Sequence, residues 1–247
     1  MQTTKKDIRS LSKEELRDFF VSQGDKSFRG NQVYEWLWSK GAHHFDDMTN
    51  LSKETRQMLE EHFVINHIKV DTMQHSTDGT IKNAVRLHDG LVVESVLIPT
   101  ETRTTACVSS QVGCSLDCNF CATARLKRMR NLGPDEIYDQ VKAIDQESRL
   151  YHNRPLSNIV FMGMGEPLMN YNNVMKAIDM ITSDEGLGMS PKRITVSTSG
   201  VSKMIKKMGI RFRLKSDQGI SSRKIKNRPT TIKMMPPTRH RFSCSSS

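Results

Sequence analysis

The sequence predicts an α/β protein that consists of a small helical N-terminal domain, an incomplete barrel of βα units and a disordered basic tail. Apolar residues recur at helical spacing through residues 1–65. From residue 81 onward, short apolar runs of strand length alternate with helical segments. This periodicity ends near residue 208, and a polar, basic, Ser-rich stretch follows. We therefore expect three regions, 1–70, 80–208 and 209–247.

The N-terminal region contains signals for three helices. Ser12-Lys-Glu-Glu15 has the capping-box pattern that starts a helix. Residues 33–38 give a dense apolar face on a second helix, and residues 51–63 give a third. Such a module is either a structural appendage or an RNA-contacting domain. The pattern alone favours the appendage.

The next segment changes to a strand period. Ile81–Leu87 and Leu91–Ile98 are two β-like runs, and Asp89-Gly90 between them is a strong hairpin signal. Beyond the hairpin, strands and helices alternate, which favours parallel βα units. The expected strands are 104–109, 158–162 and 193–197, and the expected helices are 134–147, 171–182 and 201–208. These make about three units, whereas a closed barrel usually has six to eight.

Charge is distributed unevenly along the chain. The formal net charge is +10, but residues 209–247 carry ten of the 37 Lys and Arg and one of the 27 Asp and Glu. Residues 1–208 are nearly neutral, so they lack the overall positive charge that is typical of a nucleic-acid-binding protein. The sequence shows no signal peptide and no apolar run long enough to span a membrane. We expect a cytoplasmic protein with no membrane partner.

Four of the five cysteines lie between residues 107 and 121, which indicates metal or redox chemistry in a reducing compartment. Cys114, Cys118 and Cys121 form a C-x3-C-x2-C loop. Three thiolates on one loop can hold three irons of a 4Fe–4S cluster and leave the fourth iron open to a ligand. The alternative is a zinc site with Cys107 as the fourth thiolate, although zinc ribbons prefer repeated C-x2-C pairs.

Two further motifs close expected strands. Gly163-Met-Gly165-Glu166-Pro167 offers glycines for a close backbone approach and a carboxylate that can accept hydrogen bonds from an amino group. Ser197-Thr-Ser-Gly200 ends the following strand. Each is weak evidence alone, because one is typical of a turn and the other of a helix N-cap. Together they lie at the C-terminal ends of consecutive strands, where βα barrels bind ligands.

These motifs resemble the rRNA/tRNA adenine-C2 methyltransferases of the RlmN/Cfr family. The resemblance rests on residues 107–123, on the two strand-end motifs and on Phe28-Arg-Gly-Asn-Gln-Val-Tyr-Glu-Trp-Leu-Trp38. It extends from about Ile8 to Met208. It implies a helical accessory domain on a partial radical SAM (β/α) barrel, and two cofactors, a 4Fe–4S cluster and S-adenosylmethionine (SAM).

The resemblance also implies site residues. Cluster ligands would be Cys114, Cys118 and Cys121. Contacts to SAM would come from Gly165, Glu166 and Ser197. Glu94 matches the position proposed as proton acceptor, and Cys107 matches the cysteine that resolves a covalent RNA intermediate through a transient disulfide. The implied substrate is an adenine in 23S rRNA and, in many members, one in the tRNA anticodon loop. The electron donor would be a protein such as flavodoxin.

In the implied mechanism, one SAM methylates a second catalytic cysteine, and another SAM supplies a radical that takes hydrogen from the S-methyl group. The carbon radical then adds to C2 of adenine. The family match stops near Met208, and Cys244 shares no family context, so we do not assign it the methyl-carrying role. We expect an inactive fragment with an unrelated tail whose charge is not an RNA-binding signal. Two other hypotheses are a zinc-dependent, non-enzymatic RNA-binding protein and a radical enzyme that acts on peptides.

Overall fold

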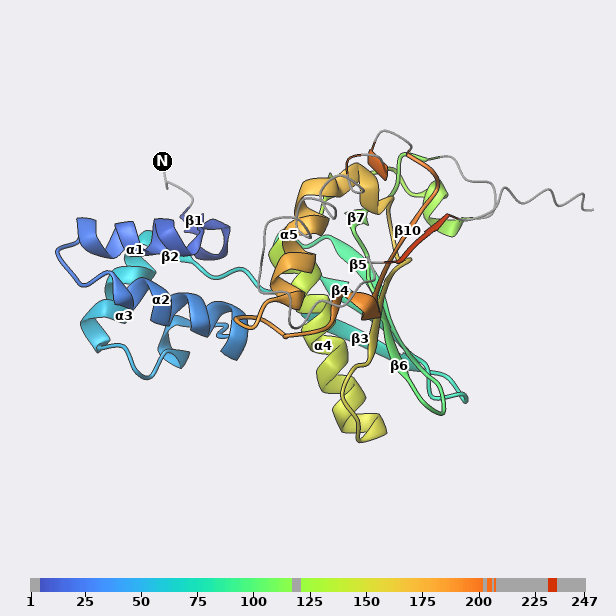
Figure 1. Cartoon of the computed structure of the whole chain (residues 1–247), viewed down its shortest axis with the longest axis horizontal. Coiled ribbons are helices and arrows are strands. Elements are labelled where there is room, and N and C mark those ends of the chain that lie inside the picture. Colours follow the sequence, from blue (N-terminus) through green and yellow to red (C-terminus); the bar gives the residue numbers. More distant parts are fainter. Residues whose placement is uncertain (1–4, 117–120, 202–203, 206, 208–230, 235–247) are drawn as a thin grey trace, which may run out of the picture.

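The computed structural model describes residues 5–116, 121–201, 204, 205, 207 and 231–234. The N-terminal helices form a module beside a mixed β-sheet, and two long helices cover one face of that sheet (Figure 1). The expected α/β class is therefore confirmed. Among the described residues, no helix has the length and apolar character needed to cross a bilayer.

The N-terminal module is closed by a short parallel pairing of its first and last strands, β1 and β2. Its elements are β1 (Lys6–Asp7), η1 (Ile8–Ser10), α1 (Lys13–Ser22), α2 (Phe28–Glu35), η2 (Trp36–Lys40), η3 (Phe45–Asp47), α3 (Lys53–His62) and β2 (Phe63–Val64). The three predicted helices are present. The second continues as a π-helix, η2, and ends at Gly41, whose φ of 75° suits a residue without Cβ.

Local sequence explains these helices. The Ser12 side chain accepts a hydrogen bond from the Glu15 backbone N–H, and the Glu15 carboxylate accepts one from Ser12, so the predicted capping box forms. Ser52 caps α3 through the backbone N–H of Thr55. The apolar faces then meet in a core that includes Leu16, Phe20, Val33, Leu37 and Leu59.

Seven of the described strands form one sheet of order β11-β10-β9-β6-β5-β4-β3. Its strands are β3 (Lys69–His75), β4 (Ile81–Arg86), β5 (Val92–Pro99), β6 (Thr104–Cys107), β9 (Asn158–Phe161), β10 (Ile194–Thr198) and β11 (Thr231–Met234). Strands β6, β9, β10 and β11 are parallel, whereas β3, β4, β5 and β6 pair antiparallel. The sequence did not predict β3, which pairs with the first strand of the predicted hairpin.

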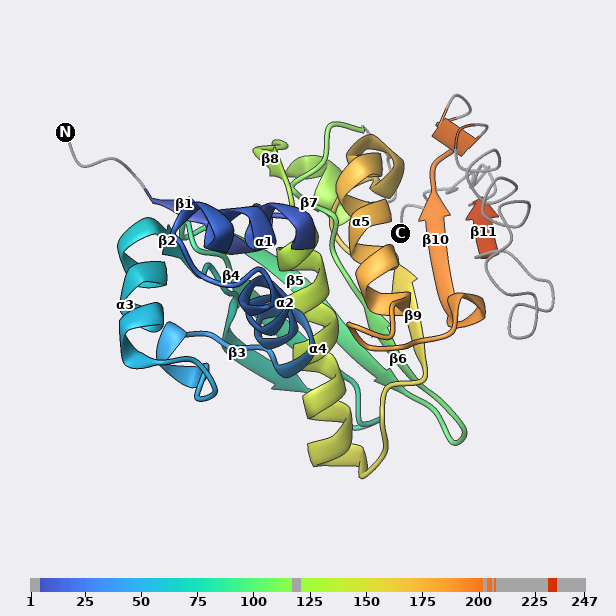
Figure 2. The same ribbon diagram turned by 60° about the vertical axis from the view of Figure 1, so that its left-hand side comes forward.

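Helices α4 (Pro134–His152) and α5 (Tyr171–Thr182) lie on the same face of the sheet (Figure 2). Buried side chains alternate along β5, and Val93 and Leu97 belong to the face covered by α4. Glu94 and Val96 therefore point to the opposite face. Cys107 pairs with Val96 across β5 and β6 and shares that face. The elements that follow the strands and carry the site are β7 (Gln111–Val112), η4 (Ala122–Arg125), β8 (Arg130–Asn131), η5 (Pro167–Asn170) and η6 (Pro191–Arg193).

The predicted tail largely lies outside the described residues. Within it, Thr231–Met234 forms β11, which pairs parallel with β10. The sequence did not predict this strand. For the predicted helix 201–208, the described residues Met204, Ile205 and Lys207 are helical.

The N-terminal module docks on α4 through a buried ion pair. Arg9 donates to both carboxylate oxygens of Asp139, at 2.7 and 2.8 Å, and lies over the Trp38 ring at 4.7 Å. The Tyr138 hydroxyl donates to the backbone carbonyl of Trp38 at 2.7 Å. These polar contacts are buried at the junction, so they fix the orientation of the module relative to the sheet.

Candidate cofactor site

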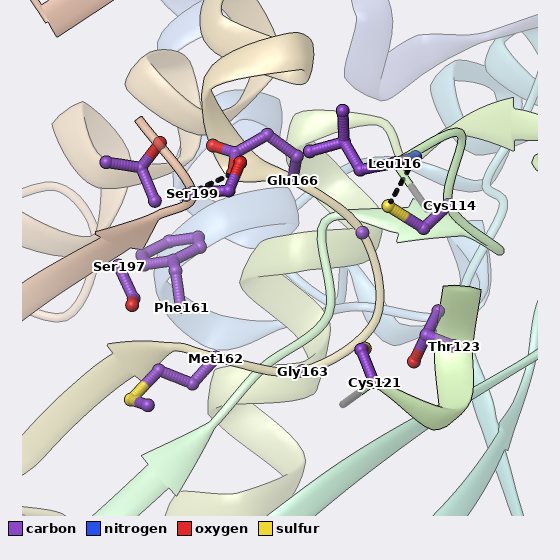
Figure 3. Close-up of a pocket in the computed structure, with 12 residues that line it drawn as sticks. Cys114, Leu116, Cys121, Thr123, Phe161, Met162, Gly163, Glu166, Ser197 and Ser199 are labelled. Carbon is purple, nitrogen blue, oxygen red and sulfur yellow. Dashed lines mark hydrogen bonds between the residues drawn. The ribbon is translucent and has the colours of Figure 1, made fainter. Parts of the chain in front are cut away.

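A pocket lies at the C-terminal ends of β9 and β10, beside the cysteine loop. It is lined by Cys114, Leu116, Cys121, Thr123, Phe161, Met162, Gly163, Gly165, Glu166, Ser197, Thr198 and Ser199. Cys114 and Cys121 lie on one side of the pocket, and Glu166 and Ser197 lie on the other (Figure 3). The tertiary structure therefore brings together three segments that the sequence keeps about 50 and 80 residues apart.

The cysteine loop is closed at its base by pairing of β7 with β8. The chain can turn into the loop because Gly113 has a φ of +73° and packs against the loop's return segment. A Cβ at this position would lie 2.3 Å from the Lys127 carbonyl oxygen. Next along the chain, the Cys114 backbone N–H donates to the Leu126 carbonyl at 3.3 Å. Glycine is thus required for the two arms of the loop to approach each other.

Two of the three predicted cluster ligands reach the pocket. The Cys114 sulfur accepts a hydrogen bond from the Leu116 backbone N–H at 3.4 Å, and Cys121 immediately precedes η4. Both thiols are free and partly buried. Cys118 lies outside the described residues, and among the described ones no group of three metal-ligating side chains comes together. Soft sulfur donors with N–H···S support fit an iron–sulfur cluster, because such hydrogen bonds tune these clusters.

The strand-end glycines hold the loop after β9 against the chain entering the cysteine loop. A Cβ on Gly163 would lie 2.7 Å from Ser109 Oγ and 2.8 Å from its backbone nitrogen. A Cβ on Gly165, whose φ is +93°, would lie 2.5 Å from Gln111 Cβ. Neither contact can be relieved by moving a flexible side-chain end. The two glycines therefore set how closely the pocket's two walls approach each other.

Glu166 is the buried charged group of the pocket, with 4% of its surface exposed. One carboxylate oxygen, Oε2, accepts hydrogen bonds from the backbone N–H and the hydroxyl of Ser199, both at 2.8 Å. The other, Oε1, accepts one from the Leu168 backbone N–H at 3.0 Å. A carboxylate oxygen has two lone-pair sites, so Oε1 can accept a further donor. Ser197, which is also buried, lines the same pocket.

Glu94 and Cys107 are not among the residues that line the pocket. Glu94 is half exposed and forms an ion pair with Lys82 at 2.7 Å. Burial raises the pKa of the Cys107 thiol, and a hydrogen bond with the Met162 backbone opposes that shift. Because Met162 lines the pocket, Cys107 is adjacent to it, on the face of the sheet opposite α4. Cys107, Cys114 and Cys121 are free thiols, so the expected disulfide remains a prediction.

Sequence reasoning missed residues that organise the site. Gln111 is fully buried, and its side-chain oxygen accepts the Glu166 backbone N–H at 2.9 Å. Its side-chain nitrogen donates to Asn131 Oδ1 at 2.7 Å. Ser199 lies within the predicted strand-end motif, but its hydrogen bonds to Glu166 were not anticipated. No sequence pattern signals such contacts, because they join residues 33 and 55 positions apart.

Two family models match the chain. Residues 6–65 match the ribosomal RNA large subunit methyltransferase N-terminal domain, and residues 108–215 match the radical SAM superfamily. A protein named "Probable dual-specificity RNA methyltransferase RlmN" from Flavobacterium johnsoniae is 83% identical over 87% of this chain and 62% of its own length. One of the same name from Flavobacterium psychrophilum is 78% identical over 97% of this chain and 68% of its own length.

A crystal structure of a radical SAM methyltransferase from Sphaerobacter thermophilus superposes with a TM-score of 0.73 at 36% identity. The alignment covers 82% of this chain and 59% of that protein. This chain thus spans about 60% of the length of several relatives that it matches. Together with the thiol-lined pocket at the strand ends, these similarities show that the chain belongs to the RlmN family of radical SAM RNA methyltransferases.

Proposed function

We propose that this chain holds a 4Fe–4S cluster through Cys114, Cys118 and Cys121 and binds SAM against Gly165, Glu166 and Ser197. The observation that carries the proposal is the single pocket that unites two cysteine thiols with the buried Glu166 carboxylate. When bound, the cluster would supply the electron that splits SAM. Every other contribution comes from the chain itself.

The pocket residues have distinct roles in this proposal. Glu166 Oε1 would accept a hydrogen bond from the SAM amino group. Ser199 donates two hydrogen bonds to Oε2 and so fixes the plane of the carboxylate. The Ser197 hydroxyl offers a further hydrogen bond from β10. Gly165 leaves room for the backbone to approach the ligand. The site therefore orients SAM by contacts from two neighbouring strand ends.

The proposed substrate is RNA: the reaction would methylate C2 of an adenine in 23S rRNA, with tRNA as a second candidate substrate, through a methyl-cysteine intermediate. The names of the relatives, dual-specificity RNA methyltransferases, support this choice. Glu94 would accept a proton and Cys107 would resolve the covalent RNA adduct. An electron-carrying protein such as flavodoxin would reduce the cluster.

We further propose that this polypeptide, as written, does not complete methyl transfer. Four of the five cysteines, Cys107, Cys114, Cys118 and Cys121, already have a role in the proposal, and the fifth, Cys244, is not assigned the methyl-carrying role. Binding of the cluster and cleavage of SAM need only Cys114, Cys118, Cys121 and the residues proposed to bind SAM. The proposal therefore separates SAM cleavage, which is retained, from 2-methyladenosine formation, which is not.

Anaerobic reconstitution with iron and sulfide tests the proposal. We expect a brown protein that releases 5′-deoxyadenosine from SAM under dithionite and forms no 2-methyladenosine on RNA. C118A should lose the cluster, whereas the matched variant C244A should keep it and cleave SAM normally. Colourless protein that takes up zinc alone would overturn the assignment and support the non-enzymatic RNA-binding alternative. Formation of 2-methyladenosine would overturn the proposed loss of methyl transfer.

A further inference from the structure

The arm of the cysteine loop that returns to β8 is strongly basic. Between Cys121 and Asn131 the sequence carries four cations and no Asp or Glu. Arg130 is neutralised by ion pairs with Asp89 at 2.5 Å and Glu136 at 2.7 Å. The other three cations have no acidic partner among the described residues.

We define the loop rim as Arg125, Leu126, Lys127, Arg128 and Met129, all of which are exposed. Leu126 is 51% and Met129 63% exposed, values that are high for large apolar side chains. Arg128 donates to Asn131 Oδ1 at 3.3 Å. The rim therefore combines two exposed apolar side chains with three unneutralised cations.

The loop rim is joined directly to a cluster ligand. Leu126 accepts a hydrogen bond from the Cys114 backbone N–H, and Met129 donates one to the carbonyl of Val112. Lys127 pairs with Cys114 as an isolated β-bridge. A partner bound on the rim would therefore lie beside the cysteines, separated from them by one layer of backbone.

We propose that the loop rim docks an acidic electron-carrier protein, which passes one electron to the cluster and is itself oxidised by one electron. This inference rests on the proposed function, because it needs a cluster that must be reduced. The cations suit an acidic partner. The short route to the cysteines suits electron transfer. Such encounter complexes are small and weak, so a surface of five residues can form a substantial part of one.

RNA is the other anionic partner to consider. The exposed apolar residues Leu126 and Met129 distinguish an acidic protein from RNA as the partner. Phosphate groups are bound by cations, and unstacked RNA bases stack chiefly on aromatic side chains, of which residues 125–129 contain none. A protein surface, in contrast, commonly buries an apolar centre inside a polar rim. The composition of the loop rim therefore favours a protein partner.

The test compares two variants of the full chain with wild type. R125A/K127A/R128A removes the three cations, and L126S/M129S removes the apolar centre but keeps the charge. A matched control, K26A/K53A/K69A, removes three exposed lysines elsewhere on the described surface. Binding is measured with purified flavodoxin at low salt, and with a fluorescent RNA hairpin that carries an unmodified loop adenine. Reduction of the reconstituted cluster is followed with reduced flavodoxin and, separately, with dithionite.

We expect the charge variant to bind flavodoxin about tenfold more weakly and to be reduced by it about tenfold more slowly. L126S/M129S should also weaken flavodoxin binding, by about threefold or more. Reduction by dithionite and affinity for the RNA hairpin should stay within twofold of wild type, and the control should resemble wild type throughout.

Two results would overturn the docking site while the proposed function stands. One is weakened RNA binding with unchanged flavodoxin binding, which would make the rim an RNA contact. The other is unchanged binding of both, which would make it a solvated loop. If wild type instead forms no cluster, the proposed function fails and the docking proposal fails with it. The absorption spectrum, taken before any binding measurement, identifies that case.

Discussion

The junction between the N-terminal module and α4 depends on Arg9, and its removal is a quantitative test of the packing. The Arg9 and Asp139 side chains are 4% and 14% exposed, and two hydrogen bonds of 2.7 and 2.8 Å join them. Breaking a buried pair of this kind costs about 3–5 kcal/mol, because the remaining charge stays buried without its partner. We expect R9M to cost about 3 kcal/mol, at the lower end because Asp139 is partly exposed.

Arg9 and Asp139 should contribute unequally to the free energy of unfolding. Burial raises the pKa values of Asp7 and Asp135, and the nearby Arg9 cation opposes both shifts, so R9M leaves three carboxylates without their cation. D139N leaves Arg9 with Asp7 and Asp135 still close, and should cost about 1–2 kcal/mol. The double variant R9M/D139N should be more stable than the sum of the single losses predicts, because it leaves no new unpaired charge at this pair.

Urea unfolding followed by tryptophan fluorescence measures these losses. Both tryptophans of the chain, Trp36 and Trp38, lie in the N-terminal module, and Trp38 stacks with Arg9. R29M is the control, because Arg29 forms an i,i+4 pair with Asp25 in which both side chains are more than a quarter exposed. It should cost less than about 1 kcal/mol. An R9M loss no larger than that of R29M, or a D139N loss equal to that of R9M, would refute the reasoning.

Three further predictions concern single residues. Burial raises the pKa of Asp135 from 3.8 to about 6, so its contribution to stability is fully present below about pH 4 and is lost as the pH rises through 6. D135N should therefore be more stable than wild type at pH 7.5, by about 1–3 kcal/mol in the free energy of unfolding measured with urea. The difference should vanish near pH 4. A parallel pH dependence of the two urea midpoints would contradict this. G165A should cost about 2–4 kcal/mol, because the backbone has a φ of +93° and the new Cβ meets Gln111. G90A is the control, because Gly90 has a φ of +81° but a new Cβ would meet nothing within 4 Å, and it should cost about 1 kcal/mol. Equal shifts in melting temperature for G165A and G90A would show that the close approach of Gly165 to Gln111 is unimportant. Q111L leaves the buried Glu166 N–H unpaired and should weaken SAM binding about tenfold in calorimetry while iron content is retained; undiminished affinity would mean that Gln111 does not position Glu166.

Much of the fold could be predicted from the sequence because its signals are local. The capping box at Ser12, the Asp89-Gly90 hairpin and the period of α5 each depend on residues a few positions apart. Strand β3 was missed because its residues are mostly exposed and carry no apolar alternation. It exists because β4 offers it a hydrogen-bonding edge.

The cysteine spacing and the two strand-end motifs were likewise visible in the sequence, because metal ligands and glycine turns have characteristic residue types. Only the tertiary structure decided that Glu166 would be anchored by Ser199 and Gln111, and that Arg9 would bind Asp139 on α4. These contacts join positions 33 to 130 residues apart. Their partners are chosen by the packing of β9, β10 and α4, since a buried polar group must take whichever partner the fold brings within reach.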